Sequence, residues 1–378
     1  MKIYRNESAY EAALDRIRYL FDEFPDVVVS FSGGKDSTVT LNLALIVAEE
    51  KNRLPLTVQF IDQEAEWEAV IRYARLVMTD PRVRPRWYQM PIKLFNATSP
   101  LAPWLYCWQE GETWMRDKEA ISIKENVYGT DRFKPLFGAI LKKEYPQHRV
   151  CNLAGVRCEE SPARTAGLTN DATYKWITWG RRLDRKYHQY AFYPLYDWSY
   201  ADIWIAIQRH GWPYCTIYDA FYQYGVSVPA MRVSNLHHET SVHALFRLQE
   251  IEPETWNALT ARLAGIATAG QLGVDDFFLK TLPFMFENWR DYRDYLLEHL
   301  IPDPAYRQRF ARKFEQMEEI YRHVIPMDRL YREHIQTIVT NDYHFTKLGN
   351  FRNRPANFCA IRDAERQKRM AKNDVGCA

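Results

Sequence analysis

The sequence has no paired cysteines. Its six cysteines are scattered, without a Cys-x-x-Cys motif or an adjacent pair, at positions Cys107, Cys151, Cys158, Cys215, Cys359 and Cys377. Zinc ribbons and iron–sulfur clusters are held by closely spaced cysteines, so we expect no iron–sulfur cluster and no zinc ribbon. In a reducing compartment these cysteines are expected to be free thiols.

Long apolar runs are also missing. No stretch approaches the roughly 18 to 20 uninterrupted apolar residues of a membrane span. The N-terminus leads into a charged amphipathic segment rather than a signal peptide. We therefore expect a cytoplasmic protein with no membrane partner. The formal net charge of +2 gives no field that would imply nucleic acid or a membrane as partner.

What the chain does have is length and aromatic side chains. At 378 residues it is long enough for two domains, and 47% hydrophobic with 26% charged content is typical of a soluble globular protein. Aromatic residues make up 15% of the chain, which favours a bulky core over aromatic-lined grooves. The sequence leaves the oligomeric state open, and a homo-oligomer is compatible with it.

One stretch near the N-terminus carries the clearest chemical signal. It joins the β-branched residues 27–29, the sequence Ser32-Gly33-Gly34-Lys35-Asp36-Ser37, and the amphipathic run 38–50. This order predicts a buried strand, a tight turn and a helix. Two adjacent glycines let successive backbone N–H groups point into one concavity, and the helix N-terminus adds the positive end of its dipole. The turn therefore predicts a phosphate site.

The side chains of this turn support the same interpretation. Lys35 would neutralise phosphate charge, while Ser32 and Ser37 would donate hydroxyl hydrogen bonds. Asp36 would cap the helix or hold Mg²⁺. The alternative is an ordinary glycine-rich elbow between a strand and a helix, of the kind that many α/β proteins contain.

The neighbouring segments predict an open parallel sheet. Helical spacing over 6–24 precedes the first strand, residues 56–62 and 86–90 predict further strands, and 66–78 predict a helix between them. This alternation implies a parallel sheet with right-handed crossovers, as in Rossmann-like α/β folds. In such sheets ligands lie beyond the carboxyl ends of the strands, so Asp62, with Gln63 and Glu64, would face the same crevice as the turn. The alternative is that Asp62 only caps the following helix.

Arginines gather in the next regular part of the chain. The stretch 93–146 looks like an insertion or lid, after which 149–157 predicts a strand. Arg157 and Arg164 bracket the turn that follows, and guanidinium groups bind phosphate or sulfate bidentately, which predicts a second anion contact. For the later group, Arg181, Arg182, Arg185 and Lys186, a solvated basic face is an equally good interpretation. Ser199 is expected to cap a helix that ends at Gly211.

These motifs together resemble one known family. The string 155–164 (Gly-Val-Arg-Cys-Glu-Glu-Ser-Pro-Ala-Arg), the string 193–204 (Tyr-Pro-Leu-Tyr-Asp-Trp-Ser-Tyr-Ala-Asp-Ile-Trp) and the turn at 32–37 are similar to the phosphoadenosine phosphosulfate (PAPS) reductase branch of the adenine nucleotide alpha-hydrolase, or PP-loop ATPase, superfamily. The resemblance covers roughly residues 20 to 235 and implies a Rossmann-like, HUP-type α/β fold, a parallel sheet with flanking helices. It implies that residues 32–37 hold the phosphates of ATP or PAPS, that Asp62 lies near the adenosine, and that Arg157 and Arg164 border the anion pocket.

The remainder of the chain predicts a different domain. Apolar spacing around 289–300 and 310–324 predicts helices, so we expect a nucleotide-binding domain over 1–235 and a helical domain with a basic tail over 236–378. Motifs at 252–256, 280–283 and 341–343 resemble a subfamily of unknown function, DUF3440. Its best-known member is immunoglobulin-binding regulator A, which is encoded on prophage-like elements and paired with a ParB-like partner.

Two further features have plain alternatives. His237, His238 and His243 lack an accompanying cysteine pair, so an ordinary polar loop is favoured over a metal site. The tail from Lys347 to Lys372 carries eight Lys or Arg against two acids, for which a solvated helix is favoured over a nucleic-acid contact.

The sequence departs from the reductases in its cysteines. Thioredoxin-dependent members carry Glu-Cys-Gly-Leu-His near the C-terminus, whereas this chain ends Asn373-Asp374-Val375-Gly376-Cys377-Ala378. We therefore expect action at the alpha phosphate of ATP, or on a sulfonucleotide, with Lys35, Asp36, Arg157 and Arg164 as the catalytic groups. The alternatives are a nucleotide-sensing regulator with a ParB-like partner and a sulfur transferase acting on nucleic acid.

Overall fold

The chain folds into two compact units. The computed structural model describes residues 6–99, 102–147, 149–169, 172–184, 186, 188–228, 231, 233, 235–238, 242–269, 281–351, 357 and 359–364. The first unit contains Met1–Leu94, Tyr106–Leu236 and Gln249–Arg262, and the second contains Phe95–Leu105, His237–Leu248 and Leu263–Ala378. The predictions for Arg185, for Cys377 and for the basic tail beyond residue 364 lie outside the described residues.

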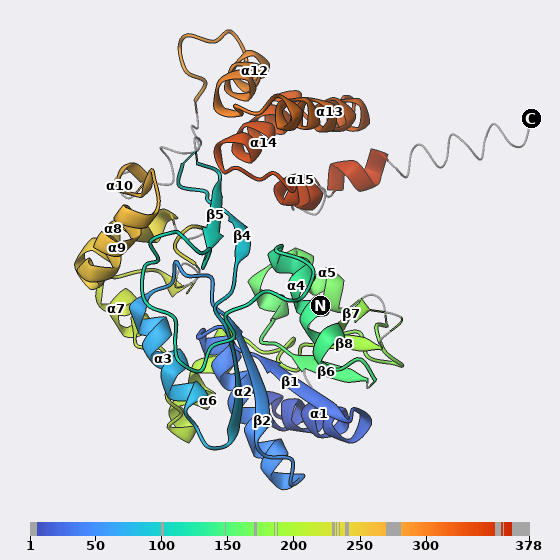
Figure 1. Ribbon diagram of the computed structural model, residues 1–378. Helices are drawn as coiled ribbons and strands as arrows, with labels where there is room; N and C mark the ends of the chain where they lie inside the picture. The colour runs from blue at the N-terminus through green and yellow to red at the C-terminus, as the bar shows by residue number, and fades with distance from the viewer. Residues whose placement is uncertain are drawn as a thin grey trace, which may run out of the picture. The chain divides into compact units, whose positions relative to one another are not determined.

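A six-stranded sheet forms the centre of the first unit (Figure 1). Its strand order is β3 (Val83–Tyr88), β2 (Leu56–Ile61), β1 (Asp26–Ser30), β6 (Val150–Leu153), β8 (Gln189–Phe192) and β7 (Gly180–Asp184). All neighbouring strands are parallel except β7, which runs antiparallel to β8 at one edge. The predicted Rossmann-like, HUP-type α/β fold is confirmed, while the antiparallel edge strand was not predicted from the sequence.

Among the described residues, nine helical segments belong to the first unit. They are α1 (Ala9–Glu23), α2 (Lys35–Glu50), α3 (Glu68–Met78), α4 (Phe133–Glu144), α5 (Pro162–Thr169), α6 (Tyr200–His210), α7 (Ile217–Gln223) and α9 (Pro253–Arg262), with a 3₁₀ turn, η1, at Cys158–Glu160. Of these, α1, α2, α3 and α4 contact strands of the sheet. The stretch 93–146, for which the sequence predicts no regular unit, contains β4 (Ile92–Phe95), β5 (Trp104–Cys107) and α4.

The two faces of the sheet are covered by different helices. Leu141 of α4 contacts Val28 and Val150 on one face, where all three side chains are buried. Because side chains alternate along a strand, Val27 and Val29 face the opposite side, where α1 and α2 lie against β1 (Figure 1). The sheet is therefore buried on both faces, as its apolar strands predict.

The strand order places a crevice at the end of β1. The chain runs from β1 to β2 on one side, while β6 pairs with β1 on the other side. Loops that leave the carboxyl ends of β1 and β6 therefore diverge to opposite sides, which is the usual ligand position in open α/β sheets. The loop 31–34 and the loop 154–157 border this position.

Helix α6 has the capping predicted for it. Ser199 Oγ accepts a hydrogen bond from the backbone N–H of Asp202 at 3.2 Å, and Asp202 Oδ2 accepts from the Ser199 N–H at 2.7 Å. At the other end Gly211 adopts a left-handed conformation with φ of 61°. This arrangement is a capping box followed by a glycine stop, and it fixes where the helix begins and ends.

Replacing Ser199 with alanine is expected to destabilise the first unit by about 1 kcal/mol, because the N–H of Asp202 loses its acceptor. Urea unfolding measures the effect as a lower midpoint with an unchanged slope. Ser199→Thr keeps a hydroxyl cap and serves as the control, with a smaller loss. Equal midpoints for Ser199→Ala and the parent chain would show that this cap contributes nothing.

The second unit has its own helical core. Its helices are α10 (Ile266–Ala269), α12 (Trp289–Leu300), α13 (Pro304–Tyr321), α14 (Met327–Val339) and α15 (Thr346–Phe351), and α8 (Val242–Ile251) begins in this unit. Phe310 and Phe314 of α13, Leu330 of α14 and Phe351 of α15 are almost fully buried in one cluster. The predicted helical C-terminal region is confirmed, with α12 and α13 matching the two helices read from apolar spacing.

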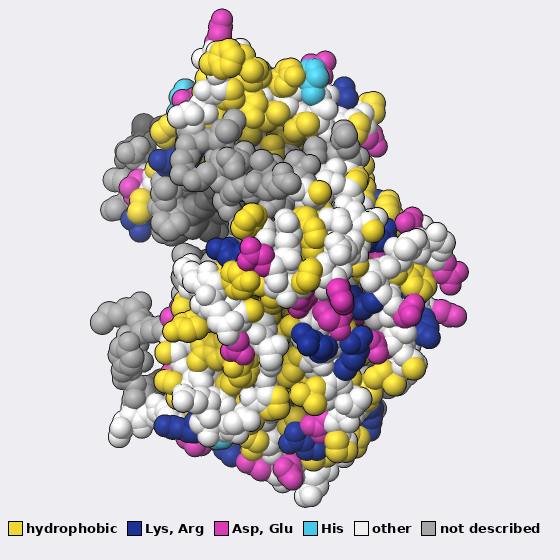
Figure 2. Space-filling model, turned by 90° about the vertical axis from the view of Figure 1, so that its left-hand side faces the viewer, with side chains coloured by type: hydrophobic (Ala, Val, Ile, Leu, Met, Phe, Trp, Pro, Cys, Tyr) yellow, Lys and Arg dark blue, Asp and Glu magenta, His cyan; other side chains and the backbone are white. Residues whose placement is uncertain are grey.

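Charges of both signs are mixed on the surface. Figure 2 shows basic and acidic side chains lying next to one another on one face. Surface ion pairs such as Arg75 with Glu68 and with Glu119, both at 2.9 Å, balance charge locally. Among the described residues, no helix combines the length and the apolar character needed to cross a bilayer.

Candidate functional site

The turn after β1 is closed by its own serines and glycine. Ser37 Oγ donates to the Gly34 carbonyl at 2.8 Å and lies 3.1 Å from Ser32 Oγ. Gly33 has φ of +72°, and a Cβ there would lie 2.7 Å from Cγ1 of Val70. Only glycine fits this position without strain, so the first glycine of the motif is required by both conformation and space.

The turn leads directly into the N-terminus of α2. Gly34 is the N-cap residue of α2 and has no side chain of its own to cap the helix. The Lys35 N–H donates to the Tyr218 hydroxyl at 3.1 Å. The first N–H groups of a helix have no intrahelical acceptor and carry the positive end of the dipole. This end of α2 therefore suits an anion, as the sequence predicts.

Three charged side chains meet beside this helix end. Lys35 Nζ lies 2.9 Å from Asp36 Oδ2, and Arg157 Nε donates to Asp36 Oδ1. Burial alone would lower the pKa of Arg157, but Asp36 and then Glu160 outweigh burial and raise it. Lys35 is only 8% exposed, with Nζ 5.6 Å from the ring centres of Tyr200 and Tyr218. Asp36 thus holds two cations together, and an incoming phosphate would compete with it for both.

These groups line a charged cavity of about 560 Å³. Its lining contains seven of the predicted site residues, Ser32, Gly34, Lys35, Asp36, Ser37, Arg157 and Arg164. Arg164 is half exposed and ion-paired with Glu160, which also lines the cavity. Sequence reasoning therefore selected residues that the fold brings together, although Arg157 and the turn are more than a hundred positions apart. We name this space the phosphate cavity.

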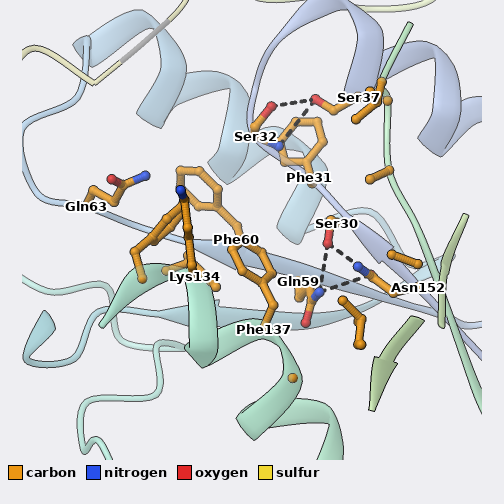
Figure 3. A pocket seen from close by; sticks show the side chains of 18 of the residues that line it. Ser30, Phe31, Ser32, Ser37, Gln59, Phe60, Gln63, Lys134, Phe137 and Asn152 are labelled. Atoms are coloured by element: carbon orange, nitrogen blue, oxygen red, sulfur yellow. Dashed lines mark hydrogen bonds between the residues drawn. The ribbon is translucent and has the colours of Figure 1, made fainter. Parts of the chain in front are cut away.

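A second, larger cavity of about 620 Å³ lies over the sheet face that α4 covers (Figure 3). Phe31 and Phe60 from the strand ends and Phe133 and Phe137 from α4 give it apolar walls. This volume is in the range of cavities that hold small ligands. We name it the apolar cavity.

Polar groups from three adjacent strands line part of the apolar cavity. Ser30 Oγ lies 2.9 Å from Asn152 Oδ1, and Gln59 Nε2 donates to Ser30 Oγ at 2.8 Å and to Asn152 Oδ1 at 3.1 Å (Figure 3). Gln59 and Asn152 are 2% and 4% exposed. Polar residues inside apolar strands were a signal in the sequence that was not used.

The two cavities meet at the turn. Ser32, Ser37, Gly155 and Val233 line both of them. Gly155, in the loop after β6, lies so close to α2 that a Cβ there would be 2.6 Å from the carbonyl carbon and oxygen of Asp36. The backbone of Gly155 and the N-terminus of α2 thus form the boundary between an apolar space and a charged one.

Asp62 lies in neither cavity lining. It is fully buried, with Oδ2 accepting from Trp87 Nε1 and Gln89 Nε2, both at 3.0 Å. Its Oδ1 accepts from Arg116 at 2.5 Å. The prediction that its side chain faces the crevice is not met. Asp62 follows a strand end as predicted, but Trp87, Gln89 and Arg116 enclose its carboxylate. Glu64 is similarly paired with Arg262 at 2.7 Å, while Gln63 does line the apolar cavity.

Glu66 is a site residue that sequence reasoning missed. It lines the apolar cavity beside Gln63 and is 7% exposed. Its Oε1 accepts from Asn235 Nδ2. Burial, followed by the charge of Asp62, raises the pKa of Glu66 to about 8. The polar stretch after β2 was noticed in the sequence, but nothing in it distinguished Glu66 from its acidic neighbours.

The later arginines and the histidines have separate positions. Arg181 lines the apolar cavity, whereas Arg182 is exposed on β7. His237 Nδ1 lies 2.6 Å from the Phe95 carbonyl, and burial lowers the pKa of His237 to about 4. Among the described residues no cluster of three or more His, Cys, Asp or Glu is arranged to hold a metal. The His243 side chain lies outside the described residues.

None of the five described cysteines lines either cavity. Cys107 and Cys151 are buried, and burial raises the pKa of both thiols. Burial also raises the pKa of Cys215 to about 12. A thiolate is the reactive form of cysteine, so these three environments oppose nucleophilic chemistry.

Magnesium was predicted at Asp36. Magnesium is commonly held by one or two protein carboxylates and by the phosphates of a bound nucleotide, rather than by a cage of side chains. Asp36 supplies one carboxylate at the phosphate cavity, and its present partners are Lys35 and Arg157. The residues therefore fit an ion that arrives with a nucleotide.

Two family descriptions match the sequence. Residues 26–224, more than half of the chain, match the phosphoadenosine phosphosulfate reductase domain, and residues 225–370 match the domain of unknown function DUF3440. An uncharacterised protein of Escherichia coli K12, YbdN, is 28% identical over 321 residues, which cover 80% of this chain and 78% of YbdN.

Three solved structures match the chain at lower sequence identity. FMN adenylyltransferase of Candida glabrata, in complex with FMN and an ATP analogue, matches with a TM-score of 0.36 and 18% identity over 58% of this chain, which spans only 64% of that enzyme. PAPS reductase of Candida auris, in a phosphate complex, matches with a TM-score of 0.31 and 15% identity. The match covers 57% of this chain and 85% of that enzyme. NH3-dependent NAD synthetase of Campylobacter jejuni matches with a TM-score of 0.31 and 10% identity. The match covers 70% of this chain and 96% of that enzyme.

Proposed function

Because the chain belongs to the phosphoadenosine phosphosulfate reductase domain family, we propose that it binds an adenine nucleotide across its two cavities. The phosphates occupy the phosphate cavity, and the base occupies the apolar cavity. The observation that carries this proposal is the shared boundary at Ser32, Ser37 and Gly155. One ligand with a charged end and an apolar end fits such a pair of spaces.

The chemistry that suits this site is substitution at the alpha phosphate of ATP. An acceptor atom attacks the alpha phosphorus, the bond to the bridging oxygen of the beta phosphate breaks, and pyrophosphate leaves. Lys35, Arg157 and the N–H groups at the start of α2 stabilise the negative charge on the phosphate oxygens. Arg164 lies at the exposed side of the cavity, where it is available to the leaving pyrophosphate. Magnesium held by Asp36 and the phosphates would neutralise further charge.

Reduction of a sulfonucleotide is less well supported. That reaction needs a thiolate near the sulfur, and none of the described cysteines is among the residues that line the two cavities. PAPS still has the base and phosphates that the two cavities suit. It is therefore proposed as a ligand, with ATP as the preferred substrate.

The second candidate function is a nucleotide-sensing regulator. It is favoured by the separate hydrophobic core of α12 to α15, which gives the chain a second folded unit for contact with a partner such as a ParB-like protein. In this role the same site binds nucleotide without turnover. Product formation therefore separates the two candidates.

Calorimetric titration with ATP, AMP and PAPS in the presence of magnesium tests the proposal, followed by chromatography of the same mixtures. We expect ATP to bind at least about tenfold more tightly than AMP. AMP lacks the beta and gamma phosphates and so makes fewer charge-assisted contacts with Lys35 and Arg157. Release of pyrophosphate supports the enzyme, and tight binding without product supports the regulator. Release of sulfite from PAPS with added thiol would contradict the preference for ATP, and no binding at all would refute the site.

A further inference from the structure

The apolar cavity contains an acid that the proposed chemistry does not use. Glu66 lies between β2 and α3, is 7% exposed, and lines the cavity on the same segment as Gln63, which is labelled in Figure 3. Asn235 Nδ2 donates to Oε1 of Glu66. A nearly buried carboxyl group that lines a cavity needs a reason, because burying a charge is costly unless it is paired.

The neighbouring acid, Asp62, forms an ion pair with Arg116. Arg116 donates to Asp62 Oδ1 at 2.5 Å and to the Glu64 carbonyl at 2.5 Å. Asp62 also accepts hydrogen bonds from Trp87 and Gln89. Glu66 instead accepts a hydrogen bond from the neutral side-chain amide of Asn235, and the charge of Asp62 opposes a second negative charge on Glu66. Burial and this repulsion both favour a proton on Glu66.

The electrostatics agree with this assignment. Burial is the largest cause that raises the pKa of Glu66, and the charge of Asp62 is the second, while Arg116 and Asn235 lower it in part. The resulting value of about 8 means that most molecules carry a proton on Glu66 at pH 7.

We propose that Glu66, in its uncharged form, reads the Watson–Crick edge of the adenine base and thereby selects adenine over guanine. A protonated carboxyl group presents one O–H donor and one acceptor oxygen. Adenine presents the complementary pair, the N1 acceptor and the N6 amino donor. Guanine presents two donors on that edge, N1–H and the N2 amino group, which an ionised carboxylate would accept. This inference rests on the proposed nucleotide site.

Other charged groups face the same space. Lys134 of α4 and Arg181 of β7 line the apolar cavity, and Glu64 is held by Arg262 next to Asp62. Lys134 and Arg181 are exposed to solvent, so their effect on Glu66 is screened. A pH dependence of binding is therefore assigned to Glu66 by comparison with Glu66→Gln, because glutamine has nearly the same shape and does not titrate.

Titration calorimetry with ATP and GTP at pH 7 and pH 9 tests the inference on the full chain. At pH 9, about one unit above the pKa, roughly one-tenth of Glu66 is protonated, so the dissociation constant for ATP is expected to rise about tenfold. The constant for GTP is expected not to rise, so the preference for ATP falls. In Glu66→Gln, which does not titrate, the ratio of the ATP constants at pH 9 and pH 7 is expected to be about one.

Two controls separate the base from the phosphates. Glu68→Gln removes an acid two positions away that pairs with Arg75 and lines neither cavity, and it should keep the tenfold ratio. Inorganic triphosphate has no base, so its affinity should show no change between the parent chain and Glu66→Gln. If ATP binds at pH 7 but Glu66→Gln keeps the tenfold ratio, or the parent chain lacks it, the inference is wrong while the nucleotide site stands. If ATP does not bind at pH 7, both fail.

Discussion

Replacing Lys35 with alanine is expected to raise the dissociation constant for ATP by about tenfold to a hundredfold. Charge-assisted hydrogen bonds contribute about 1.5–3 kcal/mol, and each 1.4 kcal/mol is a factor of ten. Lys35 is almost buried at the start of α2, so its ammonium group is already positioned before the ligand arrives. Asp36 keeps Arg157 as a partner in the variant, so no acid is left uncompensated. Calorimetry with ATP measures the loss.

A lysine on the same helix provides the matched control. Lys51 lies at the opposite end of α2, where it pairs with Asp22 on the surface at 2.6 Å. Lys51→Ala removes the same charge and should leave ATP affinity within about twofold, because an exposed charge at that distance is screened. Equal losses in the two variants would indicate a general effect of net charge rather than a specific contact.

Replacing Gly155 with alanine is expected to weaken ATP binding by about a hundredfold and to lower the free energy of unfolding by about 1–3 kcal/mol. The new Cβ would lie 2.6 Å from the carbonyl group of Asp36 and 2.8 Å from the N–H nitrogen of Ser37. These are backbone atoms of the first turn of α2, so the turn itself must move. Calorimetry and urea unfolding measure the two effects.

Gly167 in α5 is the control for this substitution. An added Cβ there has no neighbour within 4 Å, and the backbone does not need glycine. Gly167→Ala should leave ATP affinity unchanged and stabilise the chain by up to about 1 kcal/mol, since alanine favours a helix. If Gly155→Ala bound ATP as well as Gly167→Ala does, the close approach of Gly155 to the first turn of α2 would have no role in ATP binding.

The phosphate cavity was predictable from the sequence because its signals are local. The order of strand, glycine turn and helix fixes the backbone of residues 31–37, and Ser199 and Gly211 fix the ends of α6 in the same way. Arg157 was found because it follows a strand, and strand ends in a parallel sheet meet at one edge.

The apolar cavity was not predictable in this way because distant segments build it. Helix α4 comes from a stretch that shows no clear pattern, and Arg181 lies on an edge strand that runs against the others. The sequence predicts Asp62 as a cavity residue, but in the structure Arg116, Trp87 and Gln89 enclose its side chain. Glu66 was missed for a similar reason, because its environment depends on Asn235, which lies far along the chain.

The most direct test of the account is a crystal structure of the chain with a non-hydrolysable ATP analogue and magnesium. We expect the phosphates within hydrogen-bonding distance of Lys35, Arg157 and the first N–H groups of α2, and the base between Phe31, Phe60 and Glu66. A nucleotide bound in the reverse direction, with its phosphates at Lys134 and Arg181, or bound outside both cavities, would contradict the account.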